Sequence, residues 1–206
     1  MEETRRQNVG TIVLEFFIWC ANNGLTRDLG AHFDDFLYEK RLIRKHDGYS
    51  PWLSKETVQW LDEYLTKNMS ILEYGGGNST IWFAKRVKYV CCWENHHEWS
   101  AIINLWLSNE GLNNVDVITE GEPMPNRKFD MVFIDNDNFR GVVKGVGNHH
   151  RAEKILEAFS YISPGGIIVL NDDTKGSENV ARKILLENGW SRFKKTGKTH
   201  PTGFYK

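Results

Sequence analysis

From residue 69 onward the sequence alternates short apolar runs with longer amphipathic segments, and this alternation limits the fold more than any other feature. Short apolar runs are typical of buried strands, whereas apolar residues at every third or fourth position are typical of helices. The expected strands are 70–74, 89–93, 115–118, 129–134 and 166–170, and the expected helices between them are 79–86, 97–107 and 152–162. Strands and helices that alternate in this way form a parallel sheet covered by helices on both faces.

Both ends of the chain are expected to add to this α/β unit. Residues 1–50 carry apolar residues at helical spacing, which predicts an N-terminal helical extension before a domain at 51–206. Ser54 is a suitable N-cap for a further helix. After an expected helix at 177–188, the runs 190–194 and 202–205 are typical of an antiparallel pair at the edge of the sheet.

Composition excludes several classes of protein. Of 206 residues, 40% are hydrophobic and 26% are charged, which is typical of a globular chain. Lys and Arg (26) nearly balance Asp and Glu (27), so no overall field favours nucleic acid or an anionic membrane. Cys20, Cys91 and Cys92 provide no disulfide framework, and the apolar run 12–21 is too short to span a bilayer. We expect a cytoplasmic protein without a membrane partner.

The first expected strand leads into three consecutive glycines, Gly75, Gly76 and Gly77. Glycines allow a sharp turn and a close approach of the backbone to a ligand, and the helix that follows offers unpaired N–H groups. A dinucleotide fingerprint would place another glycine where Thr80 stands, and a phosphate-binding loop would contain Gly-Lys-Ser/Thr, which is absent. The turn therefore favours neither NAD nor a nucleoside triphosphate.

Two acids flank this turn. Glu73 stands directly before the glycines, where a carboxylate disfavours a pyrophosphate and favours an ammonium or sulfonium group. Glu94 ends the second expected strand, where a carboxylate can accept both hydroxyls of a ribose. An acid at each place predicts a cationic cofactor that contains a ribose.

At these positions the sequence resembles the class I S-adenosylmethionine-dependent methyltransferases. Their first motif matches Glu73, Gly75 and Gly77, their second-strand acid matches Glu94, and their fourth- and fifth-strand signatures match 128–135 and 163–170. The pattern E-Y-G-x-G-x-S-T, which begins at Glu73, is similar to that of a subset of small members. The resemblance implies a Rossmann-like, seven-stranded, mostly parallel sheet with the last strand antiparallel, and methyl transfer from S-adenosyl-L-methionine.

The resemblance also implies a set of cofactor-binding residues. The glycine turn would hold the methionine part, Glu94 the ribose, and Glu120 with Gly121 the adenine. The full set is Glu73, Tyr74, Gly75, Gly76, Gly77, Asn78, Ser79, Glu94, Asn95, Glu120, Gly121 and Asp135.

Candidate catalytic residues follow the fourth and fifth strands. Methyl transfer to a hydroxyl requires alignment of the acceptor and removal of its proton. Asp135 ends the fourth strand and Asp172 follows the fifth, at the edge where open α/β sheets bind ligands. The glycine-rich segment 140–151 is expected to be a substrate loop, in which His150 could serve as a general base.

A metal ion is not expected at this edge. Metal-dependent O-methyltransferases of the catechol type place an aspartate after strand four and an Asp-Asn pair after strand five. Here the second pair is reversed, as Asn171-Asp172. The expected reaction is therefore metal-free O-methylation of a small-molecule acceptor.

Several alternatives stay open. The segment 175–206 carries eight Lys or Arg against two acids, so methylation of RNA at a ribose is a second reading, although lysines that guard a sheet edge explain the charge more simply. An aminopropyl-type transferase and a non-catalytic module that binds the cofactor are the others. The aromatic residues Trp19, Phe33, Phe36 and Trp52 cover the cofactor cleft or face a second subunit, so a homodimer also stays open.

Overall fold

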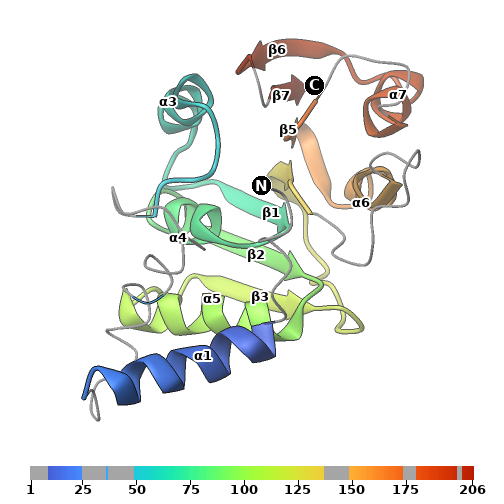
Figure 1. Ribbon diagram of the computed structural model, residues 1–206. Helices are drawn as coiled ribbons and strands as arrows, with labels where there is room; N and C mark the ends of the chain where they lie inside the picture. The colour runs from blue at the N-terminus through green and yellow to red at the C-terminus, as the bar shows by residue number, and fades with distance from the viewer. Residues whose placement is uncertain (1–8, 25–35, 37–48, 137–148, 174–179, 199–200) are drawn as a thin grey trace.

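The computed structural model describes residues 9–24, 36, 49–136, 149–173, 180–198 and 201–206, and a seven-stranded sheet forms its centre (Figure 1). The order across the sheet is β3-β2-β1-β4-β5-β7-β6. Strand β7 is antiparallel to both of its neighbours, and the other paired strands are parallel. The strands are β1 (Ser70–Tyr74), β2 (Tyr89–Glu94), β3 (Val115–Thr119), β4 (Phe129–Ile134), β5 (Ile162–Leu170), β6 (Arg192–Thr196) and β7 (Thr202–Tyr205). The expected α/β, Rossmann-like sheet is confirmed.

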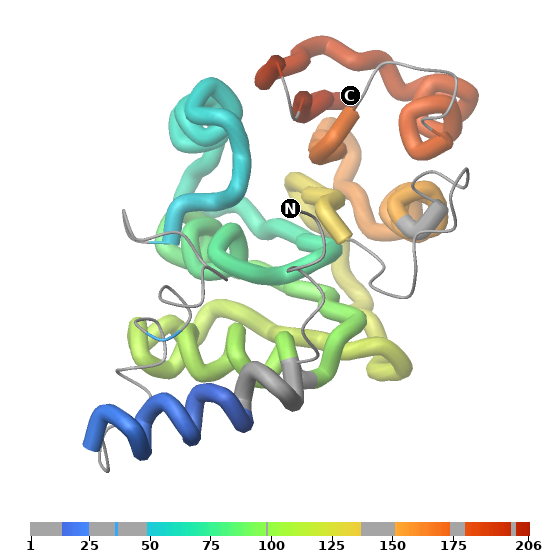
Figure 2. The backbone as a smooth tube through the Cα atoms, in the orientation of Figure 1, coloured from blue at the N-terminus to red at the C-terminus, as the bar shows by residue number. Residues whose placement is uncertain are grey.

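Helices cover both faces of this sheet. The described helices are α1 (Val9–Asn22), α3 (Lys55–Tyr64), α4 (Asn78–Ala84), α5 (His97–Asn109), α6 (His149–Ala158) and α7 (Val180–Glu187). Helices α6 and α7 lie on one face, and α3, α4 and α5 lie on the other, with α1 packed outside α5 (Figure 1). Figure 2 shows the C-terminus beside β5, because the final strand β7 pairs with it.

Alternate residues of each strand enter two separate cores. In β1, Ile71 packs on the α4–α5 face, whereas Leu72 packs on the α6–α7 face. The adjacent Cys91 and Cys92 of β2 are likewise fully buried on opposite faces, as period-two side chains require. The central strands are therefore apolar on both sides, which explains their continuous apolar runs in the sequence.

Helix α3 begins where its N-cap was expected. The hydroxyl of Ser54 accepts a hydrogen bond from the backbone N–H of Thr57 at 3.1 Å, which satisfies one of the free donors of the first turn. Leu61 is fully buried against the sheet. The Thr57 side chain is also buried, and it reaches Thr196 and Thr202 of the last two strands. Helix α3 is thereby fastened to the C-terminal edge strands.

Several expected boundaries were wrong, including that of the strand expected at 190–194, which is β6 at Arg192–Thr196. The helix expected at 152–162 is α6, which begins at His149 and ends at Ala158, so the last three residues of the segment 140–151 are helical rather than loop. Strand β5 begins at Ile162 rather than 166, because Ile162 pairs with Phe129. The glycines and proline at 163–166 indicated a turn, but they form an irregularity in the β4–β5 pairing. Residues 137–148 and the start of the expected helix 177–188 lie outside the described residues.

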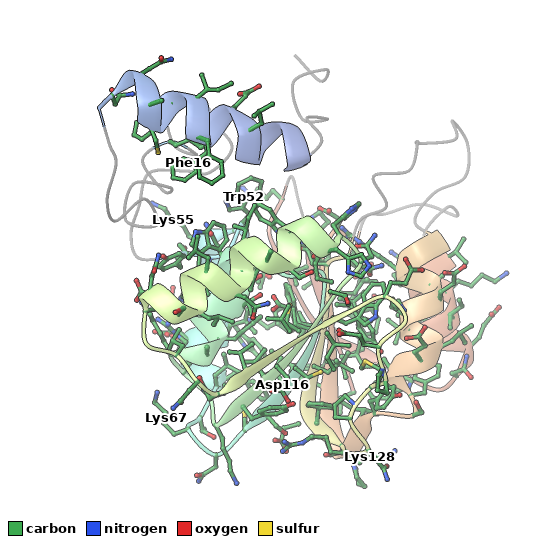
Figure 3. The ribbon with its side chains drawn as sticks, turned by 90° about the horizontal axis from the view of Figure 1, so that it is seen from below. Phe16, Trp52, Lys55, Lys67, Asp116 and Lys128 are labelled. Carbon is green, nitrogen blue, oxygen red and sulfur yellow. The ribbon has the colours of Figure 1, made fainter. Side chains whose placement is uncertain are left out.

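The described part of the N-terminal extension packs onto the domain through aromatic side chains. In α1, the ring of Phe16 lies 5.4 Å from that of the fully buried Phe36, and the ring of Tyr49, at the end of the extension, lies 5.9 Å from the ring of Trp106 in α5. Figure 3 shows Phe16 on the side of α1 that faces the rest of the molecule. Trp52 is 46% exposed, and Phe33 is outside the described residues. No described helix has the length and apolar character needed to cross a membrane.

Candidate functional site

The carboxyl ends of the central strands bring most of the predicted residues to one edge of the sheet. Tyr74 at the end of β1 pairs with Ile134 at the end of β4, and Ile134 pairs with Leu170 at the end of β5. Glu94 at the end of β2 pairs with Thr119 at the end of β3. The segments that follow these residues therefore adjoin one another, as parallel pairing requires.

The backbone of the glycine turn fits against the end of β4. Gly75 has a φ of 90°, and a Cβ atom there would lie 2.6 Å from the Cα of Asn136. A Cβ on Gly76 would collide with the thiol of Cys92. Both positions therefore require glycine, one for its backbone angle and its close contact, and the other for its close contact alone.

Gly77 differs from its two neighbours. Its φ of 167° is extended backbone, and no heavy atom of the described residues lies within 4 Å of an added Cβ. The turn below it is held rigidly, because the indole N–H of Trp99 donates to the Gly76 carbonyl at 2.8 Å. Gly77 also donates its N–H to the hydroxyl of Thr80 at 2.9 Å. The turn is thus fixed underneath and open on one side.

Glu73 lies fully buried beneath the turn. The hydroxyl of Thr80 donates to its Oε2 at 2.6 Å, while Oε1 has no hydrogen-bond partner within the described part of the chain. Burial raises the pKa of Glu73 to about 8, and the nearby hydroxyls of Ser79 and Thr80, which lower it, do not offset that rise. A cationic group beside Oε1 would compensate the buried charge and favour ionisation.

Glu94 connects the end of β2 to the glycine turn. Its Oε2 accepts the N–H of Gly76 at 3.0 Å and its Oε1 accepts the N–H of His96 at 2.9 Å, and the side chain is almost wholly buried. Burial raises the pKa of Glu94, and these backbone hydrogen bonds oppose the rise. A carboxylate has about four acceptor positions, so both oxygens keep a lone pair for a hydroxyl.

The other predicted cofactor residues are divided between the edge and the core. Asn78 and Ser79 begin α4, Asn95 follows β2, and the exposed Glu120 and Gly121 follow β3 on the same edge. Tyr74 is different, because its side chain is fully buried on the α6 face, where its hydroxyl donates to Glu157. The side chain of Tyr74 therefore points away from the turn, and only its backbone belongs to this edge.

The predicted acids after β4 and β5 converge on an arginine that sequence reasoning missed. The guanidinium of Arg151, in the first turn of α6, donates to Asp135 Oδ1 at 3.1 Å and to Asp172 Oδ2 at 3.3 Å. Asn171 donates its amide to the same Oδ1 of Asp135 at 2.8 Å. Arg151 was expected only as the end of a glycine-rich loop, where a charged residue is usually solvated, so the sequence carried no signal for its burial.

Asp173 is a second residue that sequence reasoning did not single out. It is fully buried, and its Oδ2 accepts hydrogen bonds from Arg192 at 2.9 Å and from the hydroxyl of Tyr205 at 2.8 Å. Its backbone N–H donates to the carbonyl of Pro201 at 2.7 Å. Asp173 therefore joins the end of β5 to β6 and β7, next to the predicted catalytic Asp172.

Two further points concern the predicted base His150 and a possible metal site. His150 lies in the first turn of α6, and its side chain is not among those described. Within the described residues, no group of three or more His, Cys, Asp or Glu side chains is arranged to hold a metal ion.

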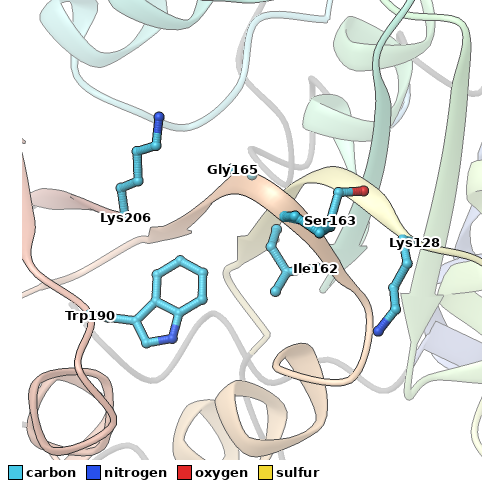
Figure 4. A pocket seen from close by; sticks show the side chains of 8 residues that line it. Lys128, Ile162, Ser163, Gly165, Trp190 and Lys206 are labelled. Carbon is cyan, nitrogen blue, oxygen red and sulfur yellow. The ribbon is translucent and has the colours of Figure 1, made fainter.

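A cavity of about 500 Å³ lies elsewhere, at the start of β5 (Figure 4). It is lined by Ile162, Trp190, the 163–166 segment and the side chains of Lys128 and Lys206. None of the predicted site residues lines it. The predicted site is therefore not this cavity but the opposite, carboxyl edge of the strands.

Comparison with known proteins supports the fold but not a sequence family. The sequence matches no family model and no curated protein significantly. Among solved structures, a methyltransferase from Pyrococcus furiosus is similar with a TM-score of 0.59 and 18% identity, over 86% of this chain and 98% of that one. The chain has the Rossmann-like methyltransferase fold.

Two further structures show the same methyltransferase fold. The ribosomal protein L11 methylase of Lactobacillus delbrueckii subsp. bulgaricus gives a TM-score of 0.57 at 11% identity, over 75% of this chain and 80% of that one. A candidate methyltransferase from Streptococcus mutans, solved in complex with SAH, gives 0.54 at 11% identity, over 75% and 99%. At such identities the similarity concerns the fold alone.

Proposed function

We propose that this chain is an S-adenosylmethionine-dependent methyltransferase that methylates a small molecule at oxygen. The observation that carries the proposal is the glycine turn, which is fixed between the buried Glu73 and Glu94 and left open at Gly77. It stands at the carboxyl edge of a sheet with the methyltransferase strand order, where open α/β sheets bind their ligands.

The residues of this turn fit the proposed cofactor. Oε1 of Glu73 has no donor among the described residues, which suits an ammonium group, and the space beside Gly77 suits a ligand that approaches the backbone. Glu94 keeps lone pairs for the ribose hydroxyls. When bound, S-adenosylmethionine supplies an activated methyl group. The binding of SAH by the Streptococcus mutans protein of the same fold supports this choice.

The acceptor would lie next to this turn, beside the acids that follow β4 and β5. Gly75 touches the backbone of Asp135 and Asn136, so the two halves of the proposed site share a wall. The carboxylates of Asp135 and Asp172 are about one-third exposed. We assign them the orientation of the acceptor hydroxyl and the removal of its proton, with His150 as the further candidate base.

Isothermal titration with SAH, S-adenosylmethionine and NAD tests the cofactor. We expect micromolar binding of both sulfur compounds and none of NAD. NAD binding without a response to SAH would overturn the proposal. Labelled S-adenosylmethionine is then incubated with fractionated metabolite pools and, separately, with RNA. Label in a small molecule supports the proposal, label in RNA favours ribose methylation, and cofactor binding without any transfer favours a non-catalytic module.

A variant of Glu94 tests the proposed ribose contact. Glu94→Ala should weaken SAH binding by about 1–3 kcal/mol, the cost of removing a charged hydrogen-bond acceptor. Glu63→Ala, which removes an exposed acid on α3 outside the predicted cofactor set, is the control and should leave SAH binding unchanged. An unchanged dissociation constant for Glu94→Ala would restrict that residue to holding the turn.

A further inference from the structure

We propose that Arg151 is the fixed cation of the acceptor side, a positioning residue that sets the geometry of Asp135 and Asp172. The proposal rests on the function proposed above, because it assigns these acids to the acceptor. It concerns a residue from a different element, helix α6, that lies outside the glycine turn and its two acids.

The guanidinium joins the segments that follow β4 and β5. Its Nε donates to the carbonyl of Asn136 at 3.1 Å and its Nη2 donates to Asp135, both after β4. Its Nη1 donates to the carbonyl of Asn171 and to Asp172, both after β5. Two carbonyls and two carboxylates therefore converge on one planar group, whose rigid fork can fix four acceptors at once.

The buried charge of Arg151 is balanced by the charges of its two carboxylate partners. The side chain of Arg151 is 8% exposed, and a buried guanidinium is costly unless charged partners and hydrogen bonds compensate it. The two carboxylates, one after β4 and one after β5, carry like charge, and the guanidinium between them compensates both. A neutral side chain at position 151 would remove this positive charge from beside both acids.

Other contacts restrict the carboxylate of Asp135 further. Its Oδ1 accepts from Arg151 and from the amide of Asn171, and Asn171 in turn accepts the hydroxyl of Thr202 from β7 at 3.1 Å. With these donors on one oxygen, the carboxylate is held in one orientation relative to the glycine turn. Four of the five N–H groups of Arg151 are used within the protein, so Arg151 acts through the acids rather than on the acceptor.

Arg151→Ala and Arg151→Lys test this role, with Arg86→Ala as the matched control. Arg86 pairs with the exposed Asp62, near the opposite edge of the sheet. In Arg151→Ala we expect the SAH dissociation constant to stay within about twofold, while the turnover number falls at least tenfold or so, as for an interaction needed in the reaction rather than in cofactor binding. Turnover is measured with the metabolite fraction that accepts label from the wild type. Arg151→Lys should keep an intermediate rate, because it restores charge without the fork.

Guanidinium chloride at low millimolar concentration tests the role of the charge, and turnover is assayed well below the melting temperature of each variant, where a merely structural role would not change it. It should restore part of the turnover of Arg151→Ala, but it should not raise that of the wild type or of Arg86→Ala, with sodium chloride as the ionic-strength control. It should also raise the melting temperature of Arg151→Ala selectively. Wild-type turnover in Arg151→Ala, or a loss that guanidinium does not restore, would overturn the proposal.

The thermal measurement separates this inference from the proposed function, since it needs neither cofactor nor acceptor. If the wild type does not bind SAH, the proposed function fails, whereas selective stabilisation by guanidinium still supports the bridge between the two acids. If Arg151→Ala does not fold, Arg151→Lys is compared with the wild type. A normal rate in Arg151→Lys together with unfolding of Arg151→Ala would show a structural role alone and overturn the proposal.

Discussion

At the scale of single residues, the three glycines of the turn have different physical tasks. Position 75 requires glycine because of its positive φ and its close contact with Asn136, whereas Gly77 faces open space. The sequence shows only a run of three equivalent letters. Their separate tasks depend on which atoms lie opposite each one, and those atoms come from β2, from α5 and from the residues that follow β4.

Alanine at each of two positions separates these tasks. Gly75→Ala should lower the free energy of unfolding by about 1–3 kcal/mol, through strain and overpacking. Gly77→Ala should change it by less than about 1 kcal/mol, and Gly77→Val should weaken SAH binding at least about tenfold by filling the open side. Urea unfolding and SAH titration provide the two measurements. Wild-type SAH affinity in Gly77→Val would mean that the ligand does not pass over this glycine.

Glu73 makes the stability of the free protein depend on pH. Its pKa is about 8 in the folded protein against an ordinary value of 4.5, because burial favours the neutral acid. The folded state therefore holds this proton more tightly than the unfolded chain. The resulting contribution to stability is complete below pH 4.5 or so and is lost as the pH rises towards about 8.

Glu73→Gln keeps the side chain neutral at every pH. The variant should gain about 2–4 kcal/mol of unfolding free energy relative to the wild type between pH 5 and pH 9. Urea unfolding at both values measures the difference, and Glu63→Gln, an exposed acid, is the control. Parallel pH profiles for wild type and Glu73→Gln would show that Glu73 is already ionised in the folded protein.

At the scale of elements, β5 and its neighbours depend on a buried acid. Asp173 receives Arg192 from β6 and Tyr205 from β7, and a Cβ on Gly203 would collide with its carboxylate. The end of β5 and the two C-terminal strands are therefore held by one side chain. Asp173 also directly follows Asp172, so the edge strands support the proposed acceptor side.

Asp173→Ala should lower the free energy of unfolding by about 2–4 kcal/mol, since it leaves Arg192 and the Tyr205 hydroxyl without their acceptor. Glu187→Ala breaks the exposed pair with Lys183 on α7 and should cost no more than about 0.5 kcal/mol. Chemical denaturation of the two variants tests the comparison. Equal effects would contradict the anchoring role of Asp173.

Sequence periodicity was sufficient to locate the helices and strands, but not to predict the contacts that set where some of them begin. Strands 70–74 and 129–134 were expected with the bounds that β1 and β4 have, because both carry continuous apolar runs between polar or glycine positions. The start of β5 was missed, since pairing of Ile162 with Phe129 outweighs the local turn signals of a proline and two glycines. Arg151 was missed because its burial depends on partners 15 to 21 residues away.

At the scale of the whole molecule, two segments that are remote in sequence form one edge. The glycine turn follows β1, and the acids with Arg151 follow β4 and β5, yet Gly75 and Asn136 are in contact. Local motifs and charge were enough to place the glycine turn and the acids Asp135 and Asp172 at this edge. The contacts of these acids with Arg151 could not be inferred, because they come from the packing of α6 against the sheet.

The same arrangement predicts that turnover is independent of divalent metal ions. Oxygens of Asp135 and Asp172 are directed at the guanidinium of Arg151, which already supplies positive charge there. Chelator should leave the rate of methyl transfer unchanged, and added Mg²⁺ should not raise it. Loss of activity with EDTA that Mg²⁺ restores would reverse this prediction.

Because all three cysteines are buried, the rate at which each is alkylated reports local opening of the structure around it. Burial raises the pKa of Cys20, Cys91 and Cys92, so their thiols rarely form the reactive thiolate in the folded state. Cys92 lies under the glycine turn, where the Thr80 hydroxyl contacts its sulfur, while Cys20 lies in α1. Alkylation of Cys92 therefore measures how often the turn lifts, and alkylation of Cys20 measures how often α1 separates from the domain. A ligand seated on the turn should slow the first rate and leave the second unchanged.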